Sequence, residues 1–402
     1  MRKYGYLIAI FLYFNISLSN AQDLLFYQLS ISPKDPSKIM IEVDTSLLGS
    51  IKAIPARSFR TRNNQPTLYC VTSKISQTLN YQEPTFCEKV TWTLTLQEVD
   101  RLGLDPTQHI DTYSPDKHWI FISEYNSFPS FESHHGRLPA TVCSPSGICK
   151  PLPQSEEPPL LLVLGQKKED IQIENKTITV QSDSKVVMNH LSIWKPTLKH
   201  QLNYISRIFP APNSSSWQIA FFSSHFNFTS RRGVIGKNTV VVNTPMQGGM
   251  LTDESIHSML VFAAHESVHL LENRQHPVWA AESLAEYYGI KSLFGTGYAM
   301  DKPVENWRTF AKNFSLSGTG LIQANENVTK KNLHQYYPIF SIKGAAFWYE
   351  LDKALQSKHS DLDDMIKFLD FDENGQFSQG FIERLTRIVG EKNWQLIAYK
   401  YL

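Results

Sequence analysis

The pattern of apolar and polar positions divides the chain into two parts. Residues 22–185 contain short runs in which apolar and polar residues alternate, such as KIMIEVD, VTWTLTL and HWIFISEY, separated by turn-forming segments such as SPKDPS and SPSG. Alternation with a period of two is typical of half-buried strands, and many short strands between turns favour a β-sandwich. We therefore predict a β-rich, sandwich-like N-terminal domain over residues 22–185.

From residue 186 onward, the apolar residues recur mainly at helical spacing. VVMNHLSIWKPTLKHQLNYISRIF and FSIKGAAFWYELDKAL are examples, whereas WQIAFF and GKNTVVVNTP have the pattern of strands. Thr252 is a suitable N-cap for a long, largely apolar helix. We predict an α+β fold, with a second domain of strands and helices over residues 186–300 and a helical C-terminal domain over residues 301–402.

The first 21 residues have the pattern of a secretory signal peptide. A basic start, an apolar stretch and the small-residue exit Ser19-Asn20-Ala21 predict cleavage after Ala21, and therefore a secreted or periplasmic protein. An uncleaved anchor is the alternative, although the apolar stretch is short for a membrane span. No later run in the sequence is long enough to cross a bilayer, so we expect no stable membrane span after cleavage. The formal net charge is +1, which gives no electrostatic indication of nucleic-acid binding.

The four cysteines are interpreted as structural. An even number of cysteines in an exported chain suggests disulfides, and proximity in sequence favours the pairs Cys70–Cys87 and Cys143–Cys149. Four cysteines permit three pairings, so the alternatives stay open at this point. None of the four is near a histidine cluster, so they are not expected to bind metal.

The candidate chemistry lies in HESVHLLENRQHPVWAAESLAEYYG, which begins at His265. Residues i and i+4 share one face of a helix, so His265 and His269 can place two imidazole nitrogens on one metal ion. Glu266, next to the first histidine, is placed to act as a general base toward water. Buried histidines with no metal are the structural alternative, and for a single histidine that alternative usually holds.

The third ligand decides the class of metal site. A metzincin needs HExxHxxGxxH, but Glu272 stands at the glycine position, Gln275 stands at the histidine position and His276 is one residue late. A gluzincin instead needs a glutamate on a following helix. Pro277 can begin that helix, which places Glu282 within its second turn.

Glu286 follows four residues after Glu282, on the same face of the predicted helix. A carboxylate there can accept a hydrogen bond from a metal-bound imidazole and hold the ring in position. The sequence therefore predicts one Zn²⁺ per chain, bound by His265, His269 and Glu282, with Glu286 behind a ligating histidine.

The segment WAAESLAEYYG resembles the second zinc-binding segment of gluzincin peptidases of the aminopeptidase N-like and glycyl aminopeptidase-like families. The order of parts is also similar, and SIKGAAFWYELD resembles a helix of the glycyl aminopeptidases that contains the dipeptide KG. The resemblance implies that residues 186–300 form a thermolysin-like zinc catalytic domain. It also implies peptide or protein substrates.

Two positions depart from the pattern of these families. The related enzymes carry a tyrosine two residues before the lysine of KG, where it stabilises the oxyanion, and this chain has Ser341 there. We predict that Tyr337, or next His334, supplies the missing hydrogen bond; Tyr336 is a further candidate.

The aminopeptidase N-like enzymes also hold the substrate's amine with a glutamate on the strand before the zinc helix. Between Thr229 and Thr252 this chain has no acidic residue. We predict that the strand around residues 240–243 is a sheet edge that pairs with an extended peptide. Its basic surroundings (Arg231, Arg232 and Lys237) favour internal or carboxylate-bearing peptides over free amines.

The sequence thus predicts an exported zinc metallopeptidase, with Glu266 as general base. The alternative is a secreted zinc-containing binding or scaffold protein, an inactive homologue of such peptidases, which the serine at position 341 keeps open.

Overall fold

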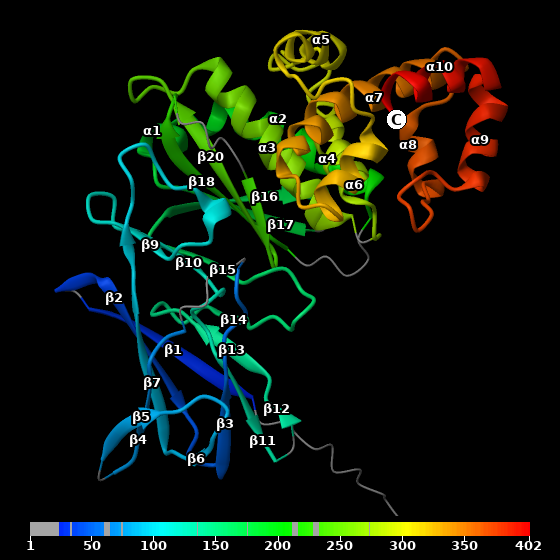
Figure 1. Ribbon diagram of the computed structural model, residues 1–402. Coiled ribbons are helices and arrows are strands. Elements are labelled where there is room, and N and C mark those ends of the chain that lie inside the picture. Colours follow the sequence, from blue (N-terminus) through cyan, green and yellow to red (C-terminus); the bar gives the residue numbers. More distant parts are fainter. Residues whose placement is uncertain are drawn as a thin grey trace, which may run out of the picture.

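The structure, a computed structural model, describes residues 24–402 apart from residues 33, 60–64, 74, 135, 175, 211–215, 228–232 and 273. The predicted signal peptide, residues 1–21, and the two arginines Arg231 and Arg232 lie outside the described residues. The chain forms a strand-rich N-terminal part and a part in which helices pack on a second group of strands (Figure 1). This mixed content confirms the predicted α+β class.

Three sheets build the N-terminal part. The seven-stranded sheet has the order β14 (Cys149–Pro151), β13 (Ala140–Cys143), β1 (Leu25–Ser32), β2 (Asp35–Asp44), β7 (Lys89–Thr95), β4 (Leu68–Val71) and β5 (Ser76–Leu79). A four-stranded sheet has the order β12 (Gly136–Arg137), β11 (Ser130–Ser133), β3 (Ser50–Ile54) and β6 (Pro84–Phe86). Another has the order β15 (Leu161–Leu164), β10 (Trp119–Ser123), β9 (Thr112–Ser114) and β8 (Gln97–Glu98).

The core of this part lies between sheets. Alternate residues of β1, β2 and β7, among them Tyr27, Ile41 and Trp92, are buried in one cluster with Ala53 of β3 and Phe131 of β11. The opposite residues of the same strands are mostly exposed. This alternation of buried and exposed positions is the one that the sequence pattern predicts.

Both disulfides involve strands of the seven-stranded sheet. Cys70 of β4 is bonded to Cys87, and Cys143 of β13 is bonded to Cys149 of β14. The pairing favoured by sequence proximity is therefore confirmed, and the four cysteines have a structural place far along the chain from the histidines.

A five-stranded sheet carries the candidate site. Its order is β16 (Lys167–Ile173), β17 (Lys176–Ser182), β18 (Gln218–His225), β20 (Thr239–Met246) and β19 (Gly233–Gly236). β17, β18 and β20 are parallel, and the two outer strands β16 and β19 are antiparallel to their neighbours.

The prediction that residues 240–243 form a sheet edge is wrong. They belong to β20, which pairs with β18 on one side and β19 on the other and is buried along its whole length. The edge is instead β19, a short strand joined to β20 by a tight turn. The run TVVVNT is apolar because both faces of an internal strand are covered.

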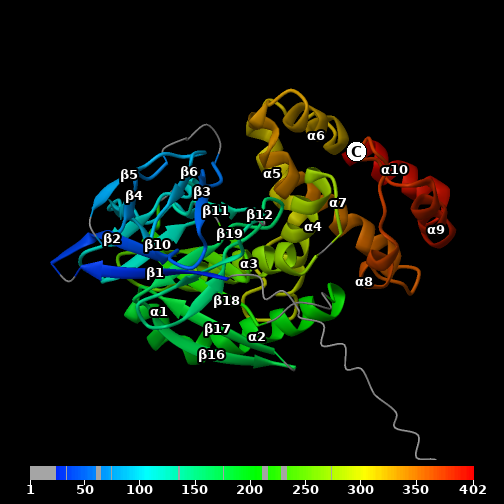
Figure 2. The ribbon, with the colours of Figure 1, turned by 90° about the horizontal axis from the view of Figure 1, so that it is seen from below.

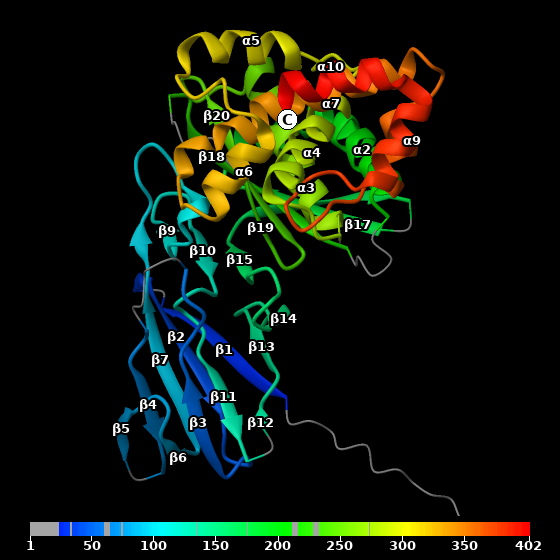
Figure 3. The same cartoon turned by 45° about the vertical axis from the view of Figure 1, so that its right-hand side comes forward.

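Helices cover one face of this sheet and form the rest of the chain (Figures 1 and 3). They are α1 (Lys185–Asn189), α2 (Leu191–Ile208), α3 (Asp253–Leu271), α4 (Val278–Lys291), α5 (Pro303–Asn313), α6 (Leu321–Thr329), α7 (Pro338–Gln356), α8 (Leu362–Met365), α9 (Gln379–Val389) and α10 (Glu391–Tyr401). Three 3₁₀ turns accompany them: η1 (Pro106–Gln108), η2 (His334–Tyr336) and η3 (Ile366–Phe368).

α3, α4 and α7 lie side by side and form the centre of the helical part (Figure 2). One hydrophobic cluster runs from Ile171 of β16 to Tyr401 of α10, so the sheet and the C-terminal helices share a core. β16 and β17 precede residue 185, where the sequence pattern places the domain boundary, yet β17 pairs with β18 and β16 pairs with β17 in the same sheet. The division into domains stays a prediction.

The other face of the five-stranded sheet packs on the strand-rich part. Ala220, Phe222 and Val241 of this sheet share a small core with Trp119 and Phe121 of β10. Among the helices of the described residues, none has the length and apolar character that a bilayer span requires.

Candidate metal centre

Two helices carry the candidate ligands, and the sequence sets where each begins. The side chain of Thr252 accepts a hydrogen bond from Ser255 N at the start of α3, which confirms the predicted N-cap. His265 and His269 lie in the last two turns of α3, most of which is buried. After α3 ends at Leu271 the chain reverses, and α4 begins one residue after Pro277.

Glycines allow these helices to approach closely. A Cβ atom at Gly289 of α4 would lie 2.9 Å from the carbonyl oxygen of Val261 on α3. On the other side of α4, a Cβ atom at Gly344 of α7 would lie 2.2 Å from Cβ of Ser283. Larger side chains at these two positions would push the helices apart. The close packing brings the glutamates of α4 to the histidines of α3.

The three predicted ligands converge on one point. His265 Nε2 lies 3.1 Å from His269 Nε2, and Glu282 Oε2 lies 3.7 Å from the first nitrogen and 3.8 Å from the second. Among the described residues, they form the group of histidine and acidic side chains that could hold a metal ion. His265 is buried, and the other two side chains are about one-fifth exposed.

These spacings fit a zinc ion. Ligands arranged tetrahedrally at about 2.1 Å from zinc lie about 3.4 Å from one another. The three observed separations fall on both sides of that value, and two imidazoles with one carboxylate leave a fourth position free for water.

Electrostatics within the group favour an anionic Glu282. Burial disfavours the charged forms of both Glu282 and His265, but the contacts of Glu282 with the two histidines outweigh burial and hold its pKa well below the usual value. For His265, the hydrogen bonds to Glu282 and Glu286 likewise outweigh burial and raise its pKa well above the usual value. A carboxylate that remains charged in this buried place is suited to a cation.

Glu286 lies behind the first histidine. Its Oε2 is 3.0 Å from His265 Nδ1, the ring nitrogen that faces away from Glu282 and His269. A carboxylate in this place accepts a hydrogen bond from Nδ1–H, so that on metal binding the ring would present an unprotonated Nε2 to the ion. The structure therefore brings Glu286 to His265, one of the two histidines predicted as ligands.

Glu266 is buried on α3 directly beside the ligands. Burial raises the pKa of its carboxyl group, while the two histidines lower it and Glu282 raises it. Gly233 of the edge strand lies against this carboxyl group, because a Cβ atom there would be 2.4 Å from Glu266 Cγ and 2.6 Å from Oε1. In the sequence, Gly233 has no distinguishing signal beyond being a glycine at the start of an apolar run.

Tyr337 reaches the ligand group from the N-cap position of α7. Its hydroxyl donates a hydrogen bond of 2.7 Å to Glu282 Oε1, and its side chain is 39% exposed. Ser341 lies one turn further along and is half-buried, and Tyr336 packs against the apolar core. His334, on η2, is exposed, and no hydrogen bond in the described residues joins it to the ligands. Of the predicted donors, the structure brings Tyr337 to the site.

The reversal between α3 and α4 is held by its own ion pairs. Glu272 accepts hydrogen bonds from Arg274, and His276 Nε2 lies 3.4 Å from Glu272 Oε2. Burial opposes ionisation of Glu272, but Arg274 and His276 together lower its pKa to about 2. His276 therefore contacts Glu272 and not the ligand group, as expected when the metzincin pattern fails.

A cavity of about 380 Å³ opens beside the second histidine. His269, Ile235 of the edge strand and apolar residues of α3 and α4 line one part. The other part is lined by the polar side chains of Glu272, Arg274, Gln275 and His276. The cavity thus lies between the ligand group and the edge of the sheet, where a side chain of a bound peptide can be received.

No family model matches the chain, and no curated protein matches it. Among solved structures, it is similar to an aminopeptidase N family protein from Idiomarina loihiensis, with 12% identity, 85% of this chain and 69% of that chain covered, and a TM-score of 0.58. A two-domain M1 zinc metallopeptidase, a substituted form bound to L-arginine, is 13% identical over 95% of this chain and 94% of that chain, with a TM-score of 0.42. The first similarity shows a common fold, and at this identity it shows the fold alone.

Proposed function

We propose that this chain is an exported zinc-dependent peptidase of the gluzincin type, which hydrolyses peptide bonds. The observation that carries the proposal is the convergence of His265 Nε2, His269 Nε2 and Glu282 Oε2 at the spacing of zinc ligands. The fold shared with an aminopeptidase N family protein supports the same conclusion. The two disulfides are compatible with an oxidising compartment outside the cytoplasm.

In this proposal His265, His269 and Glu282 hold one zinc ion, and Glu286 orients His265. Zinc supplies Lewis acidity that activates water and polarises the scissile carbonyl group. Glu266 takes the proton of the attacking water and passes it to the leaving amine.

Tyr337 is the candidate donor toward the developing oxyanion. Its hydroxyl already lies within the ligand group, bonded to Glu282. A donor aimed at the developing charge stabilises the transition state more than the substrate, because the charge on the oxygen grows as the bond forms.

The edge strand β19 is the proposed place for the substrate backbone. It pairs with β20 on one side, and Gly233 at one end lies at Glu266. An extended peptide added to this edge would run past the base and the ligands. This replaces the strand at residues 240–243 as the docking strand.

The residues of the edge strand support a preference for peptides without a free amine. A Cβ atom at Gly236 would lie 2.5 Å from the carbonyl oxygen of Pro159, so a glutamate side chain has no room there. No residue of the edge strand itself is acidic, so the strand offers no partner for a free amine. We therefore propose internal or carboxylate-bearing peptides as substrates, in place of the free-amine substrates of aminopeptidases.

A zinc assay combined with digestion of a mixed peptide library tests the proposal. We expect one zinc per chain and cleavage of peptides with blocked N-termini. Efficient cleavage of aminoacyl amides, with blocked peptides resisting, would contradict the substrate preference. Full zinc content without cleavage of any peptide would favour a zinc-containing binding or scaffold protein.

A further inference from the structure

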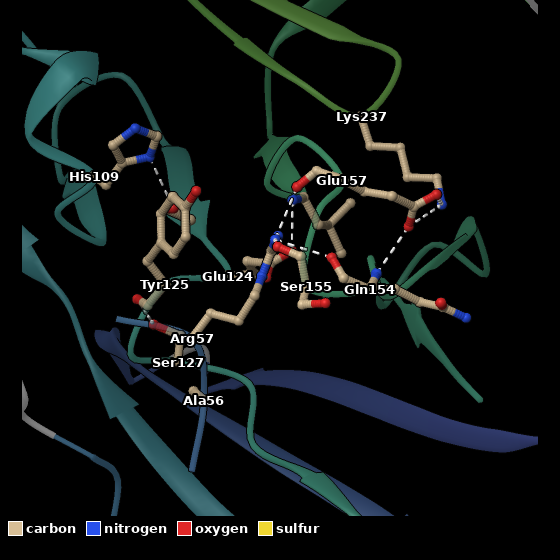
Figure 4. Close-up of polar contacts among 12 residues, drawn as sticks. Ala56, Arg57, His109, Glu124, Tyr125, Ser127, Gln154, Ser155, Glu157 and Lys237 are labelled. Carbon is tan, nitrogen blue, oxygen red and sulfur yellow. Dashed lines mark hydrogen bonds and ion pairs between the residues drawn. The ribbon is translucent and has the colours of Figure 1, made fainter. Parts of the chain in front are cut away.

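A proline-rich loop between β14 and β15 is held by an arginine of the strand-rich part (Figure 4). Nη1 of Arg57 donates hydrogen bonds to the carbonyl oxygens of Gln154, Ser155 and Glu157, at 3.0, 2.9 and 2.8 Å. Nε of the same guanidinium donates to Glu124. One side chain thus binds three carbonyl groups within four residues of the loop and also its own counter-ion.

The ion pair behind this loop is buried. The side chain of Glu124 is 3% exposed and that of Arg57 is 17% exposed. The second carboxylate oxygen of Glu124 accepts a hydrogen bond from Leu160 N, at 2.8 Å. A planar guanidinium with five donors can satisfy a carboxylate and several carbonyls at once, which a lysine cannot do.

The opposite side of the loop holds the edge strand. Glu157 forms an ion pair with Lys237, with Nζ 2.8 Å from Oε1 and 2.9 Å from Oε2. The carbonyl oxygen of Pro159 accepts a hydrogen bond from Lys237 N, at 2.8 Å. Lys237 follows directly after β19, so the loop binds the chain at the turn from β19 into β20 (Figure 4).

The other end of β19 contacts the candidate base. From Gly236 to Gly233 the strand extends for about 10 Å, and Gly233 lies against Glu266. An edge strand of four residues that pairs on one side has few backbone hydrogen bonds of its own and frays easily. Contacts at its turn therefore decide how firmly the whole strand is held.

We infer that the loop at residues 154–160, fastened by Arg57 and Glu157, is a positioning element that sets the edge strand β19 beside the metal centre. Arg57 and Glu157 are positioning residues, each more than 70 positions from Glu266 in the sequence. The expected effect of these residues on substrate binding rests on the proposed function, because β19 would pair with the peptide backbone. Their effect on the position of β19 does not depend on that function.

Hydrogen–deuterium exchange of the full-length mature protein tests the effect on the strand. We expect Glu157→Gln to accelerate amide exchange in residues 233–242 by roughly two- to five-fold, the range of a partly exposed ion pair. Arg57→Lys should accelerate the same amides more strongly, roughly ten-fold or more, because it disturbs a buried pair. Glu42→Gln is a matched control, because Glu42 pairs with Lys89 at 2.8 Å and is also 41% exposed, but it lies between β2 and β7.

Unchanged exchange in residues 233–242 in both variants, or the same acceleration in the control, would overturn the inference. The exchange result holds whether or not the protein cleaves peptides, so it separates failure of this inference from failure of the proposed function. With an active protein, Glu157→Gln should raise KM several-fold and leave kcat within about two-fold, because strand contacts bind substrate and transition state alike. A fall in kcat at unchanged KM would contradict a positioning role.

Discussion

The backbone of Gly233 lies against the carboxyl group of Glu266, at a separation that leaves no room for a side chain at position 233. The edge strand and Glu266 of α3 are thus in direct contact. A peptide paired with the strand would place its scissile bond beside the base.

Gly233→Ala should therefore displace the base without removing the metal. We expect turnover to fall about 100-fold, the scale of a lost general base, with zinc content unchanged. Peptidase kinetics and zinc analysis of the same preparation check this. Gly297→Ala is the control, because a Cβ atom there meets no neighbour within 4 Å. Full turnover in Gly233→Ala would show that Glu266 does not need its present position.

Glu286→Ala should weaken zinc binding by about 10- to 100-fold, since His265 would lose the acceptor that orients its ring. Competition with a chelator of known affinity measures the change. Glu305, an exposed glutamate on α5, gives the control substitution Glu305→Ala. Equal zinc affinity in wild type and Glu286→Ala would contradict a role of Glu286 in orienting His265.

Tyr337→Phe removes only a hydroxyl group and should lower turnover about 100-fold, as expected when one oxyanion donor is lost. Zinc content at saturating metal should remain at one per chain, because the three ligands are intact. Tyr336→Phe is the comparison, since that ring packs on the core and the described structure gives its hydroxyl no bond to the ligands. Normal turnover in Tyr337→Phe would place the donor elsewhere.

Stability should fall as the pH rises through the range in which Asp111 ionises. Burial raises the pKa of Asp111 from 3.8 to about 7, although hydrogen bonds from Ser127 and Ser123 oppose the shift. Between these two values the folded protein holds a proton that the unfolded chain has lost. The stabilisation is therefore complete below pH 4 and is lost by about pH 7, on the order of 4 kcal/mol in all.

Asp111→Asn keeps a side-chain acceptor for Ser123 N and removes the titration. Its free energy of unfolding should change less than that of wild type between pH 5 and pH 8, measured by urea denaturation. Identical pH profiles for the two proteins would show that Asp111 is ionised throughout.

The convergence of the candidate ligands could be predicted from sequence because helical geometry is local. Once a helix is expected, the spacing of His265 and His269 fixes their common face, and Glu282 and Glu286 follow in the same way on the next helix. The disulfide pairing could also be predicted from the sequence, because each pair closes a short loop.

The surroundings of the candidate ligands depend on contacts between residues that are far apart in the sequence. The edge strand was not predicted, because GVIG is short, begins and ends with glycine and does not alternate between apolar and polar residues. The longer apolar run of β20 was therefore assigned as the edge instead. Gly289 and Gly344 are ordinary helix residues in sequence, and their role emerges only when α4 lies between α3 and α7. The hydrogen bonds from Arg57 to the loop at residues 154–157 join segments about 100 positions apart in the sequence.

The central claim is zinc-dependent hydrolysis with Glu266 as base, and turnover at matched zinc content tests it most directly. Wild type, Glu266→Gln and Glu282→Ala would be compared on a peptide that the library assay selects. We predict one zinc per chain in wild type and Glu266→Gln, hydrolysis in wild type alone, and loss of most of the metal in Glu282→Ala. Hydrolysis by zinc-loaded Glu266→Gln at the wild-type rate, or full zinc content in Glu282→Ala, would contradict the account.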